Sequence, residues 1–232
     1  MSNQIDSILQ LLQNCTTEQR RAVFEHLRKE FHIHPLEQRL NTEAEIILEA
    51  IARDDTGLTF RMMRGVIAEA AFEIEVVNKL TGWRDITPDG DLSYDFMLED
   101  DFKPVRIQVK LQRSKTGKPM RANKGYRYLS SEMYVVETQR TRGGKDQETG
   151  EDTRPYRFGE FDILAVSMQP STNEWNTFMY TVANWLLQRP DDETKLLKFQ
   201  PVAILSNDDW TDDFEESVKW LRSGIQKRIR AK

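Results

Sequence analysis

The stretch YDFMLEDDFKPVRIQVKLQ, residues 94–112, decides the fold. Its two ends, residues 94–98 and 105–112, are rich in aromatic, β-branched and aliphatic side chains and are expected to form strands. Residues 99–103 between them are mostly acidic and polar, as in a turn. The sequence therefore predicts a β-hairpin at this point of the chain.

Polar side chains gather on one face of this hairpin. Successive side chains of a strand point to opposite faces, so Gln108 and Lys110 share one face while Ile107 and Val109 point into a core. The hairpin brings Asp95, at the start of the preceding strand, beside them. A carboxylate, an amide oxygen and an ammonium are then expected to converge. This combination suits a hard divalent cation and a water positioned against a phosphate.

A helix is expected before the hairpin, over residues 61–80. Its apolar residues recur at helical spacing from Val66 to Val77, and Glu69 lies in its middle. Along the chain, a carboxylate on a helix is then followed by a carboxylate at a strand start, and by an amide and a lysine on the next strand. Gln-x-Lys alone occurs by chance in many proteins, whereas this ordered set is much more specific.

The rest of the chain predicts further helices and strands around the hairpin. Helices are expected within residues 1–60, at 181–188 and at 212–227, a loop at 113–127, and strands at 133–138, 161–168, 177–180 and 201–205. A helix, three or four central strands and then more helix and strand indicate an α/β fold. We expect a mixed central sheet flanked by helices.

On these residues the chain resembles the PD-(D/E)XK nuclease superfamily. Members carry an acidic residue on a helix, an Asp at a strand start and (D/E)-x-K on the next strand, and Glu69, Asp95, Gln108 and Lys110 fill these positions. The resemblance covers residues 65–113 and, more loosely, residues 131–187. Gln108 departs from the usual acid, and a Gln-x-Lys version also occurs in the superfamily. The departure removes one negative charge, which should weaken metal affinity and lessen repulsion between carboxylates.

The resemblance implies a restriction-endonuclease-like core and a site for Mg²⁺. Asp95, the Gln108 side chain, the Val109 carbonyl and Glu69 would hold the metal, and Lys110 would bind the attacking water or the phosphate. It also implies that Glu69, Asp95, Gln108 and Lys110 are the catalytic residues. Hydrolysis would leave a 5′-phosphate and a 3′-hydroxyl.

Two of these positions have rivals in the sequence. Glu73 lies one turn beyond Glu69 on the same helix face, and Asp89 follows Pro88 in the literal Pro-Asp pair. We prefer Glu69 because small alanines flank it and would allow close approach to the sheet. We prefer Asp95 because it begins an apolar strand, whereas Asp89 lies beside a glycine in a turn.

Positive charge is concentrated after the hairpin's first strand, although the chain as a whole has a net charge of −5. Residues 103–145 contain twelve Lys and Arg against two Glu, so the remainder of the chain is strongly acidic. A basic surface beside an acidic body is expected when phosphates are met on one face. The candidate DNA-binding residues are Arg113, Lys115, Lys118, Arg121, Lys124, Arg127, Gln139, Arg140, Arg142, Arg154 and Arg157.

Length and composition predict one nuclease domain over residues 1–232. Its parts would be a helical extension at 1–58, a catalytic core at 59–187 and a C-terminal strand and helix at 188–232. A single cysteine, Cys15, excludes an intramolecular disulfide and a Cys-rich zinc site. No secretory signal or membrane-length apolar run is found, so a cytoplasmic protein is expected.

These features favour a type II restriction endonuclease, an Mg²⁺-dependent, sequence-specific cutter of double-stranded DNA. A homodimer is expected because palindromic sites match two-fold symmetry, and a cognate DNA methyltransferase would belong to the same system. Other nucleases of the superfamily remain open, namely a homing endonuclease, a junction resolvase or a repair nickase. A different class also remains open, a catalytically silent DNA-binding protein.

Overall fold

The computed structural model describes residues 2–30, 35–53, 57–140, 143–145, 150 and 152–231. The chain forms two compact units, residues 1–61 and 62–232. The predicted helical extension, residues 1–58, covers nearly the same part of the chain as the first unit. That all 232 residues belong to one nuclease domain stays a prediction.

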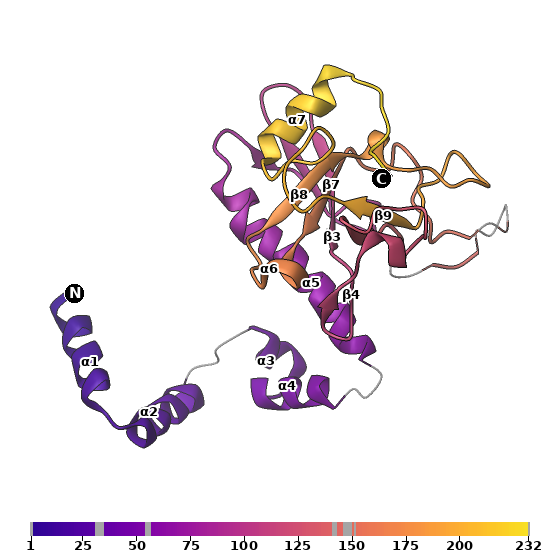
Figure 1. The fold of residues 1–232 in the computed structure, drawn as a ribbon. Coiled ribbons are helices and arrows are strands. Elements are labelled where there is room, and N and C mark those ends of the chain that lie inside the picture. The colour runs from indigo at the N-terminus through magenta and orange to yellow at the C-terminus, as the bar shows by residue number, and fades with distance from the viewer. Residues whose placement is uncertain are drawn as a thin grey trace. The chain divides into compact units, whose positions relative to one another are not determined.

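The first unit is helical in its described residues, as expected. Its helices are α1 (Ser2–Asn14), α2 (Thr17–Glu30), α3 (Pro35–Leu40) and α4 (Ala44–Ala52) (Figure 1). A capping box begins α2: the Gln19 N–H donates to Thr16 Oγ1 at 3.3 Å, and the Thr16 N–H donates to Gln19 Oε1 at 2.9 Å. This exchange satisfies two backbone donors that the first turn of a helix leaves free.

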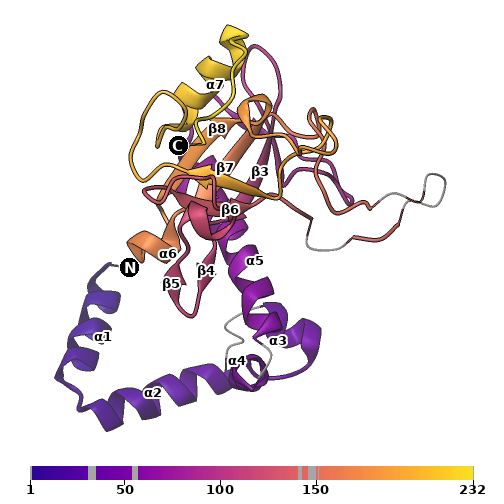
Figure 2. The same ribbon diagram turned by 45° about the vertical axis from the view of Figure 1, so that its right-hand side comes forward.

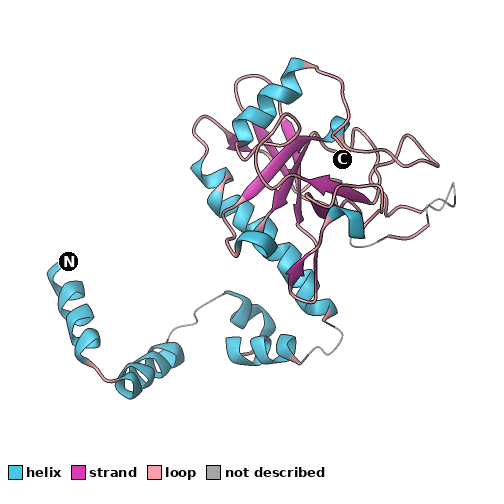
Figure 3. Ribbon diagram, in the orientation of Figure 1, coloured by secondary structure: helices cyan, strands magenta, loops and turns pink. Residues whose placement is uncertain are grey.

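The second unit is built on a five-stranded mixed sheet, which confirms the predicted α/β fold (Figure 3). Its strands, in spatial order, are β1 (Arg84–Asp85), β2 (Phe96–Glu99), β3 (Val105–Leu111), β7 (Ile163–Ser167) and β8 (Phe178–Val182). β3 and β7 are parallel, and every other neighbouring pair is antiparallel. The predicted hairpin is the β2–β3 pair, with Phe96 opposite Ile107.

Two long helices cover one face of this sheet. α5 (Leu58–Glu75), continued by the 3₁₀ turn η1 (Val77–Lys79), and α7 (Phe214–Ser223) pack with β3, β7 and β8 in one apolar cluster. Phe72 of α5 is fully buried there against the ring of Phe96, with centroids 5.2 Å apart. A short helix, α6 (Gln169–Thr172), follows β7. Of the helices that the structure describes, none has the length and apolar character needed to cross a bilayer.

The opposite face of the sheet is covered by a second, smaller sheet and by irregular chain. β6 (Tyr134–Glu137) and β9 (Phe199–Val202) pair antiparallel, and Val136 and Val202 pack in the same cluster as Leu164 and Val166 of β7. Both faces of β3 are therefore enclosed. The polar side chain of Gln108 is only 1 % exposed as a consequence.

The segment expected to be a loop at 113–127 is more ordered than predicted. It contains the hairpin of β4 (Ser114–Lys115) and β5 (Lys118–Pro119), followed by the 3₁₀ turn η2 (Ala122–Lys124) (Figure 2). Thr116 and Gly117 at its tip both have positive φ, 51° and 74°, as a two-residue type I′ turn requires. Thr116 is β-branched, so this backbone conformation is strained.

The helix expected at 181–188 is wrong for most of that span. β8 continues to Val182, and only the 3₁₀ turn η3 (Ala183–Trp185) is helical. Thr181 remains in the strand because its hydroxyl donates to the Asp209 carbonyl at 2.7 Å and its side chain is fully buried. Such a tertiary contact is not visible in a local sequence pattern.

Candidate active site

Asp95 is fixed immediately before β2 by bonds to β3. Its backbone N–H donates to the Ile107 carbonyl at 2.9 Å, so the ladder of the hairpin extends to this residue. Its carboxylate Oδ2 accepts a hydrogen bond from the Val109 backbone N–H at 2.7 Å. The same oxygen accepts a second hydrogen bond, from Gln108 Nε2. The predicted convergence of Asp95 and Gln108 is thus a direct contact.

The acceptors around Gln108 converge on one point. Its amide nitrogen donates to Asp95 Oδ2 and lies 3.3 Å from the Val109 carbonyl oxygen. These two oxygens therefore face a common position, which the neutral N–H₂ group fills. An amide can be turned about its last bond to present its oxygen instead. With Oε1 turned inward, three oxygens would line this position, as a hard cation requires.

Glu69 is the helix carboxylate that faces this position. It lies on α5 between the buried residues Ala68 and Ala71, and its side chain is half-buried. Burial, and to a smaller extent the nearby Asp95 carboxylate, raise the pKa of Glu69 to about 7, against the opposing effect of the Lys110 ammonium. The carboxylates of Glu69 and Asp95 are therefore close enough to repel each other.

The rival residues lie elsewhere. Glu73, one turn after Glu69, is exposed to solvent. Asp89 is exposed in the loop before β2, next to Gly90 with a φ of 135°. Neither faces Asp95 in the way that Glu69 does. The geometry therefore favours Glu69 and Asp95.

The carboxylate of Asp95 is largely shielded from water, and this burial changes its pKa. Burial raises the pKa of Asp95, while the Lys110 ammonium, the Val109 N–H and the Gln108 amide lower it. Two carboxylates of raised pKa that share a lysine form a site where a bound cation would relieve electrostatic repulsion. This is the strongest physical indication that the position is built for positive charge.

The donor set fits a single hard cation held by oxygen. Among the residues that the structure describes, no three His, Cys, Asp or Glu side chains group as metal ligands. A cation at this position would meet the carboxylates of Glu69 and Asp95, and amide and backbone oxygens would have to supply the other ligands. Such oxygen-only coordination is what Mg²⁺ prefers.

Lys110 points from β3 toward the second layer of the protein. Its Nζ lies over the ring of Tyr156, 5.3 Å from the centroid. Within the described part of the chain it forms no salt bridge, but its charge lowers the pKa values of Glu69 and Asp95, and it donates a hydrogen bond to the Tyr156 phenol oxygen. Burial raises the pKa of the Tyr156 phenol, and the Lys110 ammonium opposes that rise.

Some of the predicted DNA-binding residues are free at the surface. Lys115 and Lys118 are exposed on the β4–β5 hairpin, and Lys124, Arg127 and Arg154 are exposed nearby in sequence. Within the described ranges none of these five has a carboxylate partner. Their charges are available for phosphates.

Other predicted DNA-binding residues are already engaged within the protein. Arg113 pairs with Glu137, and Arg140 pairs with Glu160 at 2.7 Å. The remaining contacts are those of Arg121 with the Tyr134 ring, Arg157 with Thr194 Oγ1, and Gln139, partly buried, with Pro155 in an isolated bridge. Arg142 lies outside the described residues. The arginine side chains among them are held by these contacts, whereas the contact of Gln139 involves only its backbone.

Two neighbours of the site carry no signal in the sequence. Tyr156 comes from a polar stretch with no strand or helix pattern, yet it lies against Lys110. Arg64 on α5 donates to Gln169 Oε1 at 2.7 Å and to Ser114 Oγ at 3.3 Å, which joins the helix to α6 and to the start of the β4–β5 hairpin. Both contacts depend on elements far apart in the chain.

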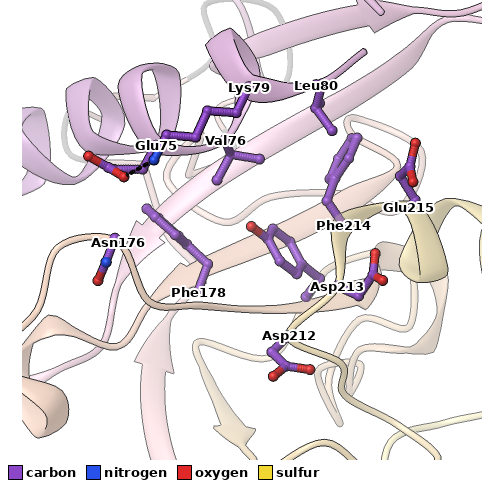
Figure 4. Close-up of a pocket in the computed structure, with 11 residues that line it drawn as sticks. Glu75, Val76, Lys79, Leu80, Asn176, Phe178, Asp212, Asp213, Phe214 and Glu215 are labelled. Carbon is purple, nitrogen blue, oxygen red and sulfur yellow. Dashed lines mark hydrogen bonds and ion pairs between the residues drawn. The ribbon is translucent and has the colours of Figure 1, made fainter. Parts of the chain in front are cut away.

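A pocket of about 550 Å³ lies near the C-terminal end of α5 and contains none of these residues (Figure 4). Its walls include the aromatic rings of Phe178 and Phe214, and its rim carries Asp212, Asp213 and Glu215. Acidic side chains at the start of α7 repel phosphate. The pocket is therefore no place for a nucleic-acid backbone.

No protein-family model matches the chain, and no curated protein matches it. Among solved structures, a bacterial homing endonuclease, I-Ssp6803I, is similar with a TM-score of 0.40 and 19 % sequence identity. The similarity covers 70 % of this chain and 94 % of that chain.

Proposed function

We propose that this protein is an endonuclease that hydrolyses phosphodiester bonds of double-stranded DNA with Mg²⁺. The observation that carries the proposal is the meeting of Glu69 and Asp95, two carboxylates of raised pKa, with the ammonium of Lys110, which forms no salt bridge within the described residues. Phosphodiester cleavage needs a positioned water and stabilisation of the charge that develops on the phosphate. The residues of this site would supply both.

Each residue has a role that follows from its surroundings. Lys110 would donate to the attacking water or to a phosphate oxygen, because its ammonium has no carboxylate partner among the described residues. Glu69, with a pKa of about 7, can accept a proton from water near neutral pH. Asp95 is oriented by the Val109 N–H and keeps its second carboxylate oxygen for other contacts.

The metal would be held by Asp95, Glu69, the Val109 carbonyl and the Gln108 amide oxygen. When bound, Mg²⁺ would supply Lewis-acid stabilisation of the phosphate and of the leaving oxygen. The Gln108 amide must turn for this, since its nitrogen now faces Asp95 and the Val109 carbonyl. Turning it exchanges two weak donations for coordination by oxygen.

Within this class we propose a type II restriction endonuclease acting as a homodimer, together with a cognate DNA methyltransferase. The exposed cations of the β4–β5 hairpin and of residues 124–127 support contact with the DNA backbone. Sequence would be read by the Arg and Gln side chains between 121 and 157. Two-fold symmetry would match a palindromic site.

One observation favours a second candidate, a catalytically silent DNA-binding protein. The Gln108 amide already satisfies Asp95 Oδ2 and lies beside the Val109 carbonyl, so the polar groups are satisfied without a metal. A homing endonuclease, a junction resolvase or a repair nickase would use the same site on a rarer or branched substrate.

The test is incubation of purified protein with unmethylated phage and plasmid DNA, in Mg²⁺ or in EDTA. Lys110→Ala removes the free ammonium, and Lys219→Ala is a matched control because that lysine is exposed on α7 and pairs with Glu216. Discrete Mg²⁺-dependent bands with wild type and Lys219→Ala, absent with Lys110→Ala, are the expected result.

The other outcomes point to the alternatives. Cleavage of a four-way junction only would indicate a resolvase, and nicking without double-strand breaks would indicate a repair enzyme. Salt-sensitive DNA binding with no cleavage of any of these substrates would overturn the restriction-endonuclease proposal in favour of a homing endonuclease with a rare site or of the silent binding protein.

A further inference from the structure

We propose that Tyr156 is a positioning residue for Lys110, whose ring face fixes the place of the ammonium in the site. This inference rests on the proposed function, because the position of Lys110 matters only if that residue meets a substrate. The sequence gives Tyr156 no role.

The contact is close and lies in a buried place. Lys110 Nζ is 5.3 Å from the centroid of the Tyr156 ring, and Tyr156 is only 4 % exposed. A cation over an aromatic face within about 6 Å is attracted by the ring's quadrupole, and more strongly when water is excluded. The phenol oxygen of Tyr156 also accepts a hydrogen bond from Lys110. Ring and oxygen together hold the ammonium without neutralising its charge, which a carboxylate partner would do.

The ring itself is held rigidly. The Tyr156 carbonyl accepts a hydrogen bond from the Leu196 N–H at 2.8 Å, which ties the backbone to a neighbouring segment. The Tyr156 ring packs edge-on against Phe161, with centroids 5.4 Å apart and an interplanar angle of 87°. A fixed ring can serve as a reference surface for a long, flexible side chain such as lysine.

A second cation shares the same ring. Arg140 Cζ lies 5.2 Å from the Tyr156 centroid, and its guanidinium pairs with Glu160 at 2.7 Å. Glu160 also accepts from the Arg157 N–H at 2.9 Å, which closes the loop that follows Tyr156. Glu160 compensates the charge of Arg140, so Arg140 holds the ring without strongly repelling Lys110.

The variants distinguish the effect of the Tyr156 ring from that of its hydroxyl and from that of apolar packing at this position. Tyr156→Phe keeps the ring, Tyr156→Met and Tyr156→Leu remove it, and both apolar replacements are included because one of them can fail to fold. Tyr134→Leu is the matched control, because its ring carries Arg121 at 4.3 Å and not Lys110. Folding is checked by urea denaturation for every variant.

The first readout is spectroscopic and needs no activity. Lysines are reductively methylated with ¹³C, and the Lys110 signal is identified by its loss in Lys110→Arg. We expect an upfield ring-current shift of this signal in wild type, Tyr156→Phe and Tyr134→Leu, and its loss in Tyr156→Met and Tyr156→Leu. An unshifted Lys110 signal in the wild-type protein overturns the contact, whether or not the protein cuts DNA.

The second readout is the single-turnover rate of DNA cleavage at saturating protein. Misplacement of a catalytic group lowers the rate of the chemical step, so we expect Tyr156→Met to be about tenfold slower or more, with DNA affinity unchanged. Tyr134→Leu should cleave at the wild-type rate, and Tyr156→Phe, which keeps the ring but loses the hydrogen bond to Lys110, should lose less than Tyr156→Met. Equal losses in Tyr156→Phe and Tyr156→Met, or a wild-type rate in a folded Tyr156→Met, would overturn the role of the ring. A wild-type protein that never cleaves DNA would contradict the proposed function. A shifted Lys110 signal would in that case still show the contact between Lys110 and Tyr156.

Discussion

Asp95 Oδ2 receives two neutral donors, the Val109 backbone N–H at 2.7 Å and the Gln108 side-chain amide. Here the amide stabilises the Asp95 carboxylate in the absence of a cation. An amide at this position would offer a metal one negative charge fewer than a carboxylate.

Replacing Gln108 by an acid should lower the stability of the metal-free protein and raise its affinity for a metal ion. In Gln108→Glu a third carboxylate enters a place where residue 108 is 1 % exposed, and the donation to Asp95 is lost. Without metal we expect a loss on the order of 3 kcal/mol in the free energy of unfolding. Millimolar Mg²⁺ should recover most of it, measured as the rise in Tm that Mg²⁺ causes.

A second buried glutamine offers the control. Gln200 is fully buried and bonds to the Leu187 backbone N–H and carbonyl, away from any proposed metal ligand. Gln200→Glu should also be destabilised, but Mg²⁺ should leave its Tm where it was. An equal response of the two variants to Mg²⁺ would show that residue 108 is not beside a cation site.

The raised pKa of Glu69 predicts a stability that depends on pH. The pKa is about 7 in the folded chain against 4.5 for a free Glu, so between these values the folded state holds a proton that the unfolded state has lost. Stability conferred by protonated Glu69 is full below pH 4.5, falls as pH rises to 7 and stays low above it.

Glu69→Gln removes this dependence. At pH 8 the variant should have a Tm about 3 °C above wild type, which is about 1 kcal/mol for a domain of this size after allowing for partial exposure. At pH 4 the two proteins should melt together. Glu73→Gln, exposed one turn later, should follow wild type at every pH in thermal melts without metal. A Glu69→Gln curve parallel to wild type would show that Glu69 is not held in this environment.

The central part of this site could be predicted from the sequence because its residues are linked by local rules. A period of two places Gln108 and Lys110 on one face, and a short turn places Asp95 beside them. Glu69 could be predicted from the helical period and from the small alanines beside it. The β2–β3 pairing and the helix α5 follow from the same patterns. The face expected for that helix is wrong, because α5 buries Ala68, Ala71 and Phe72, whereas Val66 and Ile74 of the expected apolar stripe are 62 % and 58 % exposed.

What surrounds the site could not be predicted, because it depends on contacts between distant segments. Tyr156 reaches Lys110 only because irregular chain and the β6–β9 pair cover the second face of the sheet. The same covering buries Gln108. The hairpin at 114–119 was missed since its turn places Thr116 at positive φ, which β-branched residues rarely adopt.

A charged pair between two strands should support the sheet beside the site. Arg106 of β3 donates to both carboxylate oxygens of Asp162, at 3.0 and 2.8 Å, and its backbone N–H donates to the same group at 2.9 Å. Asp162→Ala leaves three donors without their acceptor. We expect a loss of about 2 kcal/mol in urea unfolding, since both side chains are partly exposed.

The matched control is Glu99→Ala, which breaks a more exposed ion pair with Arg84 on the neighbouring strands. Surface pairs of this kind contribute little, so the change should stay within about 0.5 kcal/mol. Similar losses for Asp162→Ala and Glu99→Ala would mean that bidentate geometry adds nothing here.

The β4–β5 hairpin should contact the DNA backbone. Lys115 and Lys118 pair across it, are exposed and have no carboxylate partner in the described part of the chain. Each phosphate contact contributes about 0.9 to the slope of log K against log salt concentration. The double variant Lys115→Ala/Lys118→Ala should therefore bind DNA more weakly at low salt and lower the slope by about 2.

The control keeps the same loss of charge at another place. Lys79→Ala/Lys219→Ala removes two exposed lysines that pair with Glu75 and Glu216 on the helical side of the sheet. Its slope should equal that of wild type, because these lysines lie beside acidic residues that repel phosphate. An equal fall in slope for both double variants would mean that only the net charge of the protein matters. The β4–β5 hairpin would then not be part of the DNA-binding surface.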